Sequence, residues 1–313
     1  MNRAVKVLGA AALGALAWGT LVEPRLFTVR RHTLPIMPHN AAPVRVLQLS
    51  DLHLAPWQHR KIAWVRQLAE LRPDFVILTG DLMGHLEAHD ALMYALEPFR
   101  GTPGVFVHGS NDYYGPIAKN PFKYLTAPSR LSTRHPDLDN AALTAGLREL
   151  GFADLNNAAT TLTVGGTPFE FVGLGDPHIR YDDPATMHAA MAAAGMAAAG
   201  VTAGDTAGSH EVQDRPVRLG VVHAPYQSAL NTLLSAGASA IFAGHTHGGQ
   251  VRVPGIGALT SNCDLPVGQA RGLSVWYDAE RAAYLNVSAG LGGSIYAPVR
   301  FACRPEASLL TLE

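Results

Sequence analysis

Apolar runs of strand length alternate with amphipathic stretches in the first half of the chain. Val44–Leu49 and Phe75–Thr79 are predicted strands, and Lys61–Leu71 between them carries apolar residues at helical spacing. The predicted elements that follow are a helix over His89–Phe99, a strand over Gly104–Val107 and a helix over Ala141–Leu150. We expect regular structure to begin at Val44. This order of elements predicts parallel strands joined by helical crossovers.

Short strands dominate the second half of the chain. The predicted strands are Thr160–Val164, Phe169–Leu174, Val217–Val222, Ala240–Ala243, Gly272–Trp276 and Ala283–Val287. The first two form a predicted hairpin through Gly165-Gly166, and the last two form a final pair. Together the two halves predict an α/β fold in which two sheets pack face to face with helices outside.

An Ala- and Gly-rich insertion near 185–210 interrupts this pattern. It predicts a helix from about Pro184 to Ala194 and a mobile loop over Gly195–Ser209 that carries no chemistry of its own. Because no repeat or independent linker divides the chain, we predict a single domain over residues 44–313.

An apolar run over Val7–Val22 precedes this domain, with Arg3 and Lys6 before it. Residues 1–24 are predicted to be a signal anchor or a cleaved signal peptide, with a buried helix as a further alternative. A small-x-small site at Ala15-Leu16-Ala17 would suit cleavage. Residues 25–43 are predicted to be a connector. Basic residues flank the run in nearly equal numbers, so the positive-inside rule does not fix the orientation of the segment. Our hypothesis is an extracytoplasmic catalytic domain.

Composition narrows the possible functions. With 48% hydrophobic and 16% charged residues, the chain can bury a sizeable core. Its formal net charge of -1 gives no electrostatic footprint for phosphate backbones, so we expect no nucleic-acid partner. The two cysteines, Cys263 and Cys303, are either unpaired thiols or a disulfide, which would require the oxidising side of a membrane.

Polar clusters follow five of the predicted strands, at the strand ends where α/β sheets gather their ligands. In chain order these clusters are Asp51-Leu52-His53, Gly80-Asp81, Gly109-Ser110-Asn111-Asp112, His223 and Gly244-His245-Thr246-His247-Gly248-Gly249. The spacing of Asp51 and His53 lets both side chains converge on one ion, and a carboxylate such as Asp81 can bridge two cations. Each cluster alone is also typical of an ordinary turn. Their conjunction in this order predicts a metal centre.

These motifs resemble those of the calcineurin-like metallophosphoesterases, over roughly Val44–Val287, and within them a bacterial branch with an N-terminal membrane segment. The resemblance implies a four-layer α/β/β/α sandwich of two packed mixed sheets. It also implies two divalent metal ions, from among Mn, Fe, Zn and Mg. The implied ligands are Asp51, His53, Asp81 and His247 for the first ion, with Asp81 bridging, and Asn111, His223 and His245 for the second. The implied reaction is hydrolysis of phosphomonoester or phosphodiester bonds by in-line attack of a metal-bridging hydroxide.

The third motif departs from the family pattern, which usually reads Gly-Asn-His followed by Asp or Glu. A gapless match places Ser110 at the metal-ligand position and Asn111 at the acid. A slip of one residue places Asn111 on the metal and Asp112 at the acid, and we prefer it because an amide oxygen is the better neutral ligand. The usual leaving-group histidine is missing in both. His108 and Asp112 are the substitute acid candidates, and His178 in Gly175-Asp176-Pro177-His178 is either a substrate-side residue or part of a turn.

Two competing functions remain open on the sequence. The missing histidine also suits a metal-binding membrane protein that is catalytically weak or silent. Alternatively, the loop of His245 and His247 holds a single structural zinc without a second ion. If the protein is an enzyme, the apolar segment favours a phosphate ester that is lipid-linked or part of the cell envelope as its substrate.

Overall fold

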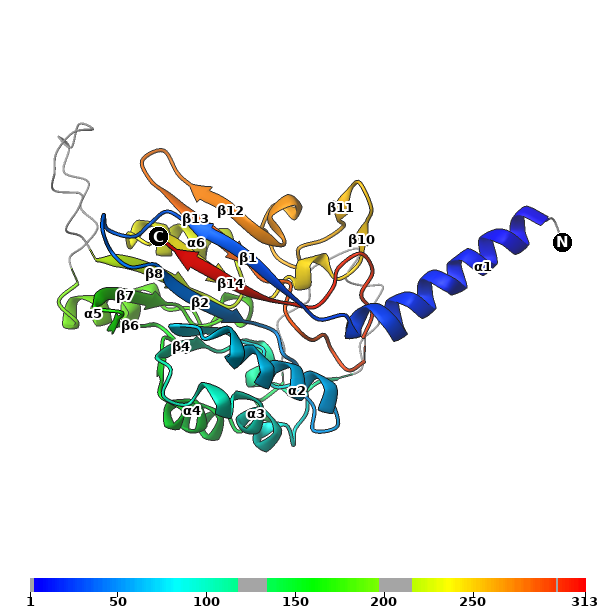
Figure 1. The fold of residues 1–313 in the computed structure, drawn as a ribbon, viewed down its shortest axis with the longest axis horizontal. Coiled ribbons are helices and arrows are strands. Elements are labelled where there is room, and N and C mark those ends of the chain that lie inside the picture. Colours follow the sequence, from blue (N-terminus) through cyan, green and yellow to red (C-terminus); the bar gives the residue numbers. More distant parts are fainter. Residues whose placement is uncertain (1–2, 118–133, 197–215, 297) are drawn as a thin grey trace.

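A computed structural model describes residues 3–117, 134–196, 216–296 and 298–313. Two six-stranded sheets make up most of it (Figure 1). The first sheet has the order β1 (Thr28–Leu34), β14 (Glu306–Leu312), β2 (Val44–Leu49), β3 (Phe75–Thr79), β4 (Gly104–Val107) and β5 (Phe152–Asp154). The second has the order β12 (Gly272–Tyr277), β13 (Ala282–Val287), β9 (Ala240–Ala243), β8 (Val217–Val221), β7 (Thr167–Gly173) and β6 (Ala158–Val164). A short antiparallel pair, β10 (Arg252–Val253) with β11 (Gly257–Ala258), stands apart.

The predicted crossover pattern is confirmed. Strands β2, β3 and β4 pair in parallel, and the connections between them contain α2 (His59–Gln67) and α3 (His89–Leu96). The other helices are α1 (Arg3–Ala17), α4 (Asn140–Glu149), α5 (Pro184–Ala193) and α6 (Gln227–Ser235). The hairpin of β6 and β7 and the antiparallel pair of β12 and β13 also form as predicted. Both sheets combine parallel and antiparallel pairs.

Alternate residues of the central strands supply different cores, which creates the layers. Phe75 and Ile77 of β3 pack against the second sheet, together with Phe171 and Leu219. Because successive side chains of a strand point to opposite faces, Val76 instead packs with the helices α2, α3 and α4. A third cluster joins the second sheet to α5 and α6. The result is a four-layer arrangement of helices, two sheets and helices.

The prediction that regular structure begins at Val44 is wrong. Strand β1 begins at Thr28 and pairs in parallel with β14, which itself pairs antiparallel with β2. This strand contains the polar residues Arg30, Arg31 and His32, so it lacks the apolar alternation by which strands are predicted. Charged side chains are typical of an edge strand, where they discourage pairing with another chain. The connector therefore contributes to the first sheet.

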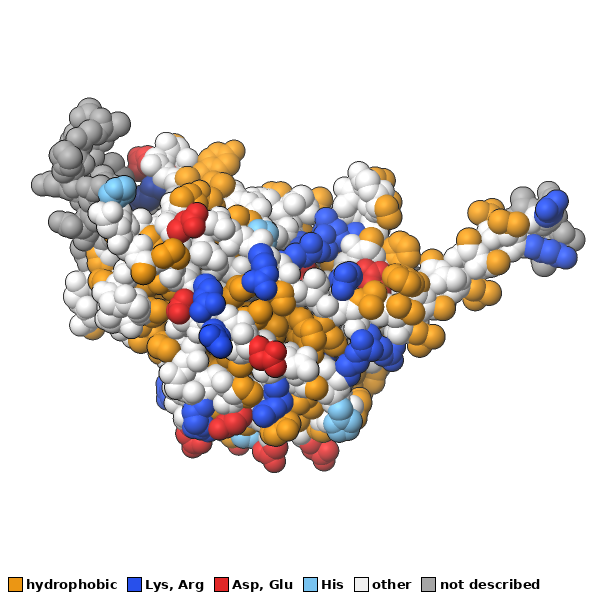
Figure 2. Space-filling view, viewed as in Figure 1, with side chains coloured by type: hydrophobic (Ala, Val, Ile, Leu, Met, Phe, Trp, Pro, Cys, Tyr) orange, Lys and Arg blue, Asp and Glu red, His pale blue; other side chains and the backbone are white. Residues whose placement is uncertain are grey.

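The N-terminal helix projects away from the sheets (Figure 1). Helical structure continues past α1, so that Val5–Arg25 forms a stretch of 21 residues that contains an 18-residue window with a mean hydropathy of 1.7, of which 6% is buried. Among the described residues, this is the helix long and apolar enough to cross a bilayer, a test that a signal sequence also passes. Figure 2 shows apolar side chains exposed along it.

Two smaller predictions concern the thiols and the insertion. Cys263 and Cys303 are both free in the structure, Cys303 being buried, so the disulfide does not form there. The predicted Ala-rich helix is present as α5. Of the predicted mobile loop, residues 197–209 lie outside the described part of the chain.

Candidate metal centre

Four of the predicted site residues come together within a few ångströms. One ligand atom from each of Asp51, His53, Asp81 and His247 lies within 4.8 Å of the others. The Nε2 atoms of His53 and His247 are 3.3 Å apart. Asp81 Oδ2 lies 3.5 Å from His53 Nε2, and Asp51 Oδ1 lies 3.5 Å from His247 Nε2. Residues nearly 200 positions apart are joined because they follow the ends of β2, β3 and β9.

The remaining predicted ligands also lie near Asp81 or near one another. His223 Nε2 lies 3.5 Å from Asp81 Oδ2, and this buried nitrogen has no hydrogen-bond partner. Asn111 donates to both Asp81 oxygens, from its backbone N–H at 2.8 Å and from Nδ2 at 2.7 Å. The rings of His223 and His245 meet edge to face, with their centroids 5.2 Å apart. Asp81 thus contacts His53 of the first group as well as His223 and Asn111.

Five of these residues have a left-handed backbone conformation, which residues other than glycine rarely adopt. The φ values are 47° for Asp51, 39° for His53, 53° for Asp81, 68° for His245 and 49° for His247. Each such conformation costs about 1 to 3 kcal/mol of stability. Residues in these conformations are common at functional sites, where the surrounding fold enforces them. The sequence motifs gave no sign of this feature.

Glycine at position 109 allows the two halves of the site to approach. A Cβ there would overlap Asp81 Oδ1 and lie 2.7 Å from His223 Nε2. The backbone of Gly109 is extended, so the requirement is one of space rather than of conformation.

In two of the histidines, a hydrogen bond made by Nδ1 fixes Nε2 as the nitrogen that faces the centre. His223 Nδ1 donates to the carbonyl oxygen of Thr79 at 2.7 Å, and His247 Nδ1 donates to that of Gly292 at 3.1 Å. Each bond leaves Nε2 to face Asp81 or Asp51, as in metal-binding histidines. Buried Arg300 donates hydrogen bonds to the same Gly292 carbonyl oxygen and, at 2.8 Å, to the carbonyl oxygen of Ala289. Arg300 lies in an irregular C-terminal segment, and no sequence signal pointed to it.

Burial dominates the electrostatics of Asp51, His53, His245 and His247. It raises the pKa of Asp51 to about 7 and lowers the pKa of His53 to about 4. Burial also holds the pKa values of His245 and His247 well below the usual value for histidine, so both rings are neutral at pH 7. Neutral imidazoles are the form that binds metal.

His223 and Asp81 behave as a coupled pair. Burial acts to lower the pKa of His223, but the carboxylates of Asp81 and Asp176 outweigh it and raise that pKa well above the usual value. Burial acts to raise the pKa of Asp81, but His223 outweighs it and keeps that pKa well below the usual value. Without a cation, a proton on His223 therefore supplies positive charge beside Asp81.

The two substitute acids predicted from the sequence, His108 and Asp112, both make contacts within the fold. The buried Asp112 carboxylate accepts three backbone N–H groups, from Leu82, Met83 and Gly109, at 2.8, 3.1 and 2.9 Å. His108 Nε2 lies 2.8 Å from Thr144 Oγ1, on helix α4. The Asp112 carboxylate is thus engaged by the backbone, whereas the buried Nδ1 of His108 has no hydrogen-bond partner and lies 3.8 Å from Asp112 Oδ2.

His178 lies beside the centre instead. Its ring centroid is 4.5 Å from that of His245, and its Nδ1 is 3.1 Å from the hydroxyl oxygen of Tyr226. The residue is half-buried, which leaves part of it open to a substrate. The substrate-side interpretation of His178 therefore fits its position.

The donor set suits divalent cations. It combines carboxylate oxygens with neutral imidazole nitrogens, which bind borderline ions such as Zn²⁺, Mn²⁺ and Fe²⁺. The buried Nε2 of His223, without a hydrogen-bond partner, is the kind of atom that a bound cation would satisfy. The residues present thus fit a metal centre.

Comparisons with known proteins agree with this chemistry. UDP-2,3-diacylglucosamine pyrophosphatase LpxG of Chlamydia trachomatis is 26% identical, covering 94% of this chain and 91% of its own. The uncharacterized metallophosphoesterase YkuE of Bacillus subtilis is 24% identical, covering 98% and 95%. The phosphodiesterase YaeI of Escherichia coli is 26% identical, covering 93% and 90%. A family model described as calcineurin-like phosphoesterase matches residues 44–249, so the chain belongs to the calcineurin-like phosphoesterases.

Proposed function

We propose that the protein hydrolyses phosphate esters at a centre of two divalent cations that share Asp81. The observation that carries this proposal is the position of one carboxylate oxygen: Asp81 Oδ2 lies 3.5 Å from His53 Nε2 and 3.5 Å from His223 Nε2. Asp51, His53, Asp81 and His247 would hold one ion. Asp81, Asn111, His223 and His245 would hold the other.

The charge of the site supports a phosphate substrate. When bound, the two cations would bind the phosphate oxygens and supply hydroxide at neutral pH for in-line attack on phosphorus. Asp51 and Asp81 together contribute two negative charges against the four positive charges of the ions, while neutral His53 and His247 add none. The remaining positive charge attracts a phosphate anion without an arginine cluster.

The fixed geometry of the chain's own residues orients the site. Backbone carbonyls hold the rings of His223 and His247, so little reorganisation is needed when a substrate arrives. We place His178 on the substrate side, where its ring can contact the leaving group or the phosphate. It takes the place of the histidine that the third motif lacks.

We propose a membrane-associated phosphate ester or diphosphate as the substrate class. Two features support it: the apolar helix Val5–Arg25 and the similarity to a relative named for a diacylglucosamine pyrophosphatase activity. The helix would act as an anchor, with the catalytic domain on the extracytoplasmic side as the favoured orientation.

Hydrolysis of bis-p-nitrophenyl phosphate by the full-length chain in detergent tests the activity. We expect hydrolysis that depends on added Mn²⁺ and is lost on treatment with EDTA. A folded, metal-loaded protein that is inactive with several metals would favour the silent metal-binding alternative, which the missing histidine motivates. A screen over phosphomonoesters, nucleotides, cyclic nucleotides and lipid-linked diphosphates would then define the substrate.

A further inference from the structure

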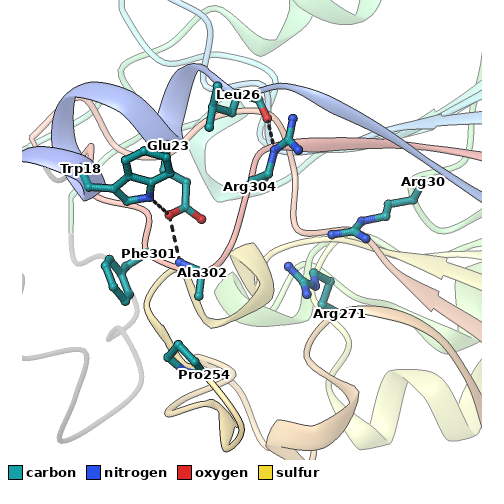
Figure 3. Close-up of a pocket in the computed structure, with 9 residues that line it drawn as sticks. All are labelled: Trp18, Glu23, Leu26, Arg30, Pro254, Arg271, Phe301, Ala302 and Arg304. Carbon is teal, nitrogen blue, oxygen red and sulfur yellow. Dashed lines mark hydrogen bonds between the residues drawn. The ribbon is translucent and has the colours of Figure 1, made fainter. Parts of the chain in front are cut away.

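A groove of about 390 Å³ lies where the N-terminal helix meets the sheets (Figure 3). Its walls come from the end of the helix, the start of β1, the β10–β11 turn and the segment before β14. The lining residues are Trp18, Glu23, Leu26, Arg30, Pro254, Arg271, Phe301, Ala302 and Arg304. None of them belongs to the candidate metal centre, so the groove needs a separate explanation.

Positive charge predominates in the groove. Arg30, Arg271 and Arg304 line it, and Figure 2 shows Lys and Arg side chains gathered near the base of α1. The contacts of Arg304 are with the carbonyl oxygens of Leu26 and Phe27, at 2.8 and 3.3 Å. Arg271 contacts the Cys303 thiol at 3.8 Å. Neither contact neutralises a guanidinium charge.

The two acidic groups nearby are buried, although Glu23 also lines the groove. Glu23 is 3% exposed, and its carboxylate accepts from Trp18 Nε1 at 2.8 Å and from the backbone N–H of Ala302 at 3.0 Å. Glu306 is 1% exposed and pairs with Arg30 at 3.0 Å. Arg271 and Arg304 are therefore left to attract an anion.

Apolar side chains share the groove with these arginines. In Figure 3 the rings of Trp18 and Phe301 lie on one side and the three arginines on the other. Trp18 is 46% exposed. Ile256 does not line the groove, but it lies in the turn that contains Pro254 and is 78% exposed. Tryptophan and arginine together are typical of the boundary between lipid tails and head groups.

We propose that this groove binds the phosphate of an anionic membrane phospholipid at the level where the N-terminal helix leaves the bilayer. The guanidinium groups would hold the phosphate, and Trp18, Phe301 and Ile256 would contact the first carbons of the acyl chains. The groove then fixes the catalytic domain on the membrane surface. This inference depends on the helix entering the membrane and not on the hydrolytic activity.

Titration of the full-length chain in detergent with short-chain lipids tests the proposal. The probes are dihexanoyl phosphatidylglycerol, dihexanoyl phosphatidylcholine and inorganic phosphate, with EDTA present so that the metal centre offers no cation to phosphate. We expect the anionic lipid to bind at least about tenfold more tightly than either of the others. Equal binding of the two lipids, or phosphate binding as tightly as the anionic lipid, would overturn the proposal.

Variants locate the binding site. The double variant Arg271→Gln/Arg304→Gln should weaken binding of the anionic lipid at least about tenfold, whereas Arg271→Lys/Arg304→Lys keeps the charge and most of the affinity. Arg148→Gln, on the exposed face of α4, is the matched control and should bind normally. Unchanged binding by the double variant, or equal loss in the control, contradicts the proposal. If the double variant does not fold, exposed Arg304→Gln alone carries the test.

Discussion

His53 and His247 face each other with their Nε2 atoms 3.3 Å apart, and their ring centroids are 5.0 Å apart. Because the Nδ1 proton of His247 is used on Gly292, its Nε2 carries a lone pair directed toward His53. Burial keeps both pKa values low, so both rings are neutral, and in the metal-free chain the Nε2–H of His53 can donate to this lone pair. A cation would take the place of the shared proton and bind both nitrogens, so the pair is arranged for metal binding.

Metal removal should therefore destabilise the chain. We expect EDTA to lower the melting temperature by about 5 °C or more, since saturation at a hundred times Kd contributes about 2.7 kcal/mol. Thermal unfolding with EDTA, and again after Mn²⁺ is restored, measures the effect. A chain that has lost its metal by elemental analysis but melts at the same temperature would contradict this interpretation.

Asp81→Asn tests whether one carboxylate serves both ions. If Asp81 is shared, the variant should lose more metal than Asp51→Asn, and its phosphodiesterase activity should fall by more than about 100-fold. Asp90→Asn, in an exposed position on α3, is the control and should keep full metal content and activity. Two ions retained in Asp81→Asn would rule out the shared position.

Gly109→Ala tests the close approach of the two halves of the site. The added methyl group would overlap Asp81 Oδ1 and crowd His223 Nε2, so we expect a loss of about 1 to 3 kcal/mol of stability and weaker metal binding. Gly268→Ala is the matched control, because a Cβ there meets nothing within 4 Å. Denaturant unfolding and metal titration of both variants measure the difference, and equal behaviour would show that the centre tolerates the methyl group.

The parallel strands of the core and the strand-end positions of the candidate ligands were predictable, because buried parallel strands have continuous apolar runs and their ends carry distinctive polar motifs. Strand β1 was not, since Arg30 and Arg31 on an edge need no apolar alternation. The three-residue strand β5 is too short to carry a pattern.

The parts of the site that sequence could not supply depend on tertiary contacts. Asp112 directly follows the candidate ligand Asn111 in the sequence, but its carboxylate accepts hydrogen bonds from three backbone N–H groups. His178 is distant in sequence, yet its ring lies against His245. Which of two polar residues faces a substrate is decided by such contacts, and motif spacing does not report them.

Metal affinity should rise with pH up to about neutrality. In the metal-free chain, burial raises the pKa of Asp51 to about 7, so below that pH the residue must release a proton before it binds a cation. His53, with a pKa of about 4, has no proton to release over this range. The affinity of the first ion should therefore increase about tenfold per pH unit between pH 5 and 7 and level off above.

Isothermal titration with Mn²⁺ in two buffers of different ionisation enthalpy measures the released protons. We expect about one proton per first-site ion at pH 6 and fewer at pH 8. An affinity that is constant from pH 5 to 8 would mean that Asp51 is already ionised in the metal-free chain.

The identity of the leaving-group acid can be tested with substrates that differ in their need for one. If His178 assists the leaving group, His178→Ala should slow esters of poor leaving groups by about 100-fold or more and p-nitrophenyl esters much less, because p-nitrophenolate leaves without a proton. Asp112→Asn should instead reduce stability, since it weakens the acceptor of three N–H groups, and should not discriminate between leaving groups. A leaving-group dependence that appears only in Asp112→Asn would return that carboxyl to the role that the motif assigned to it and reduce His178 to a turn residue.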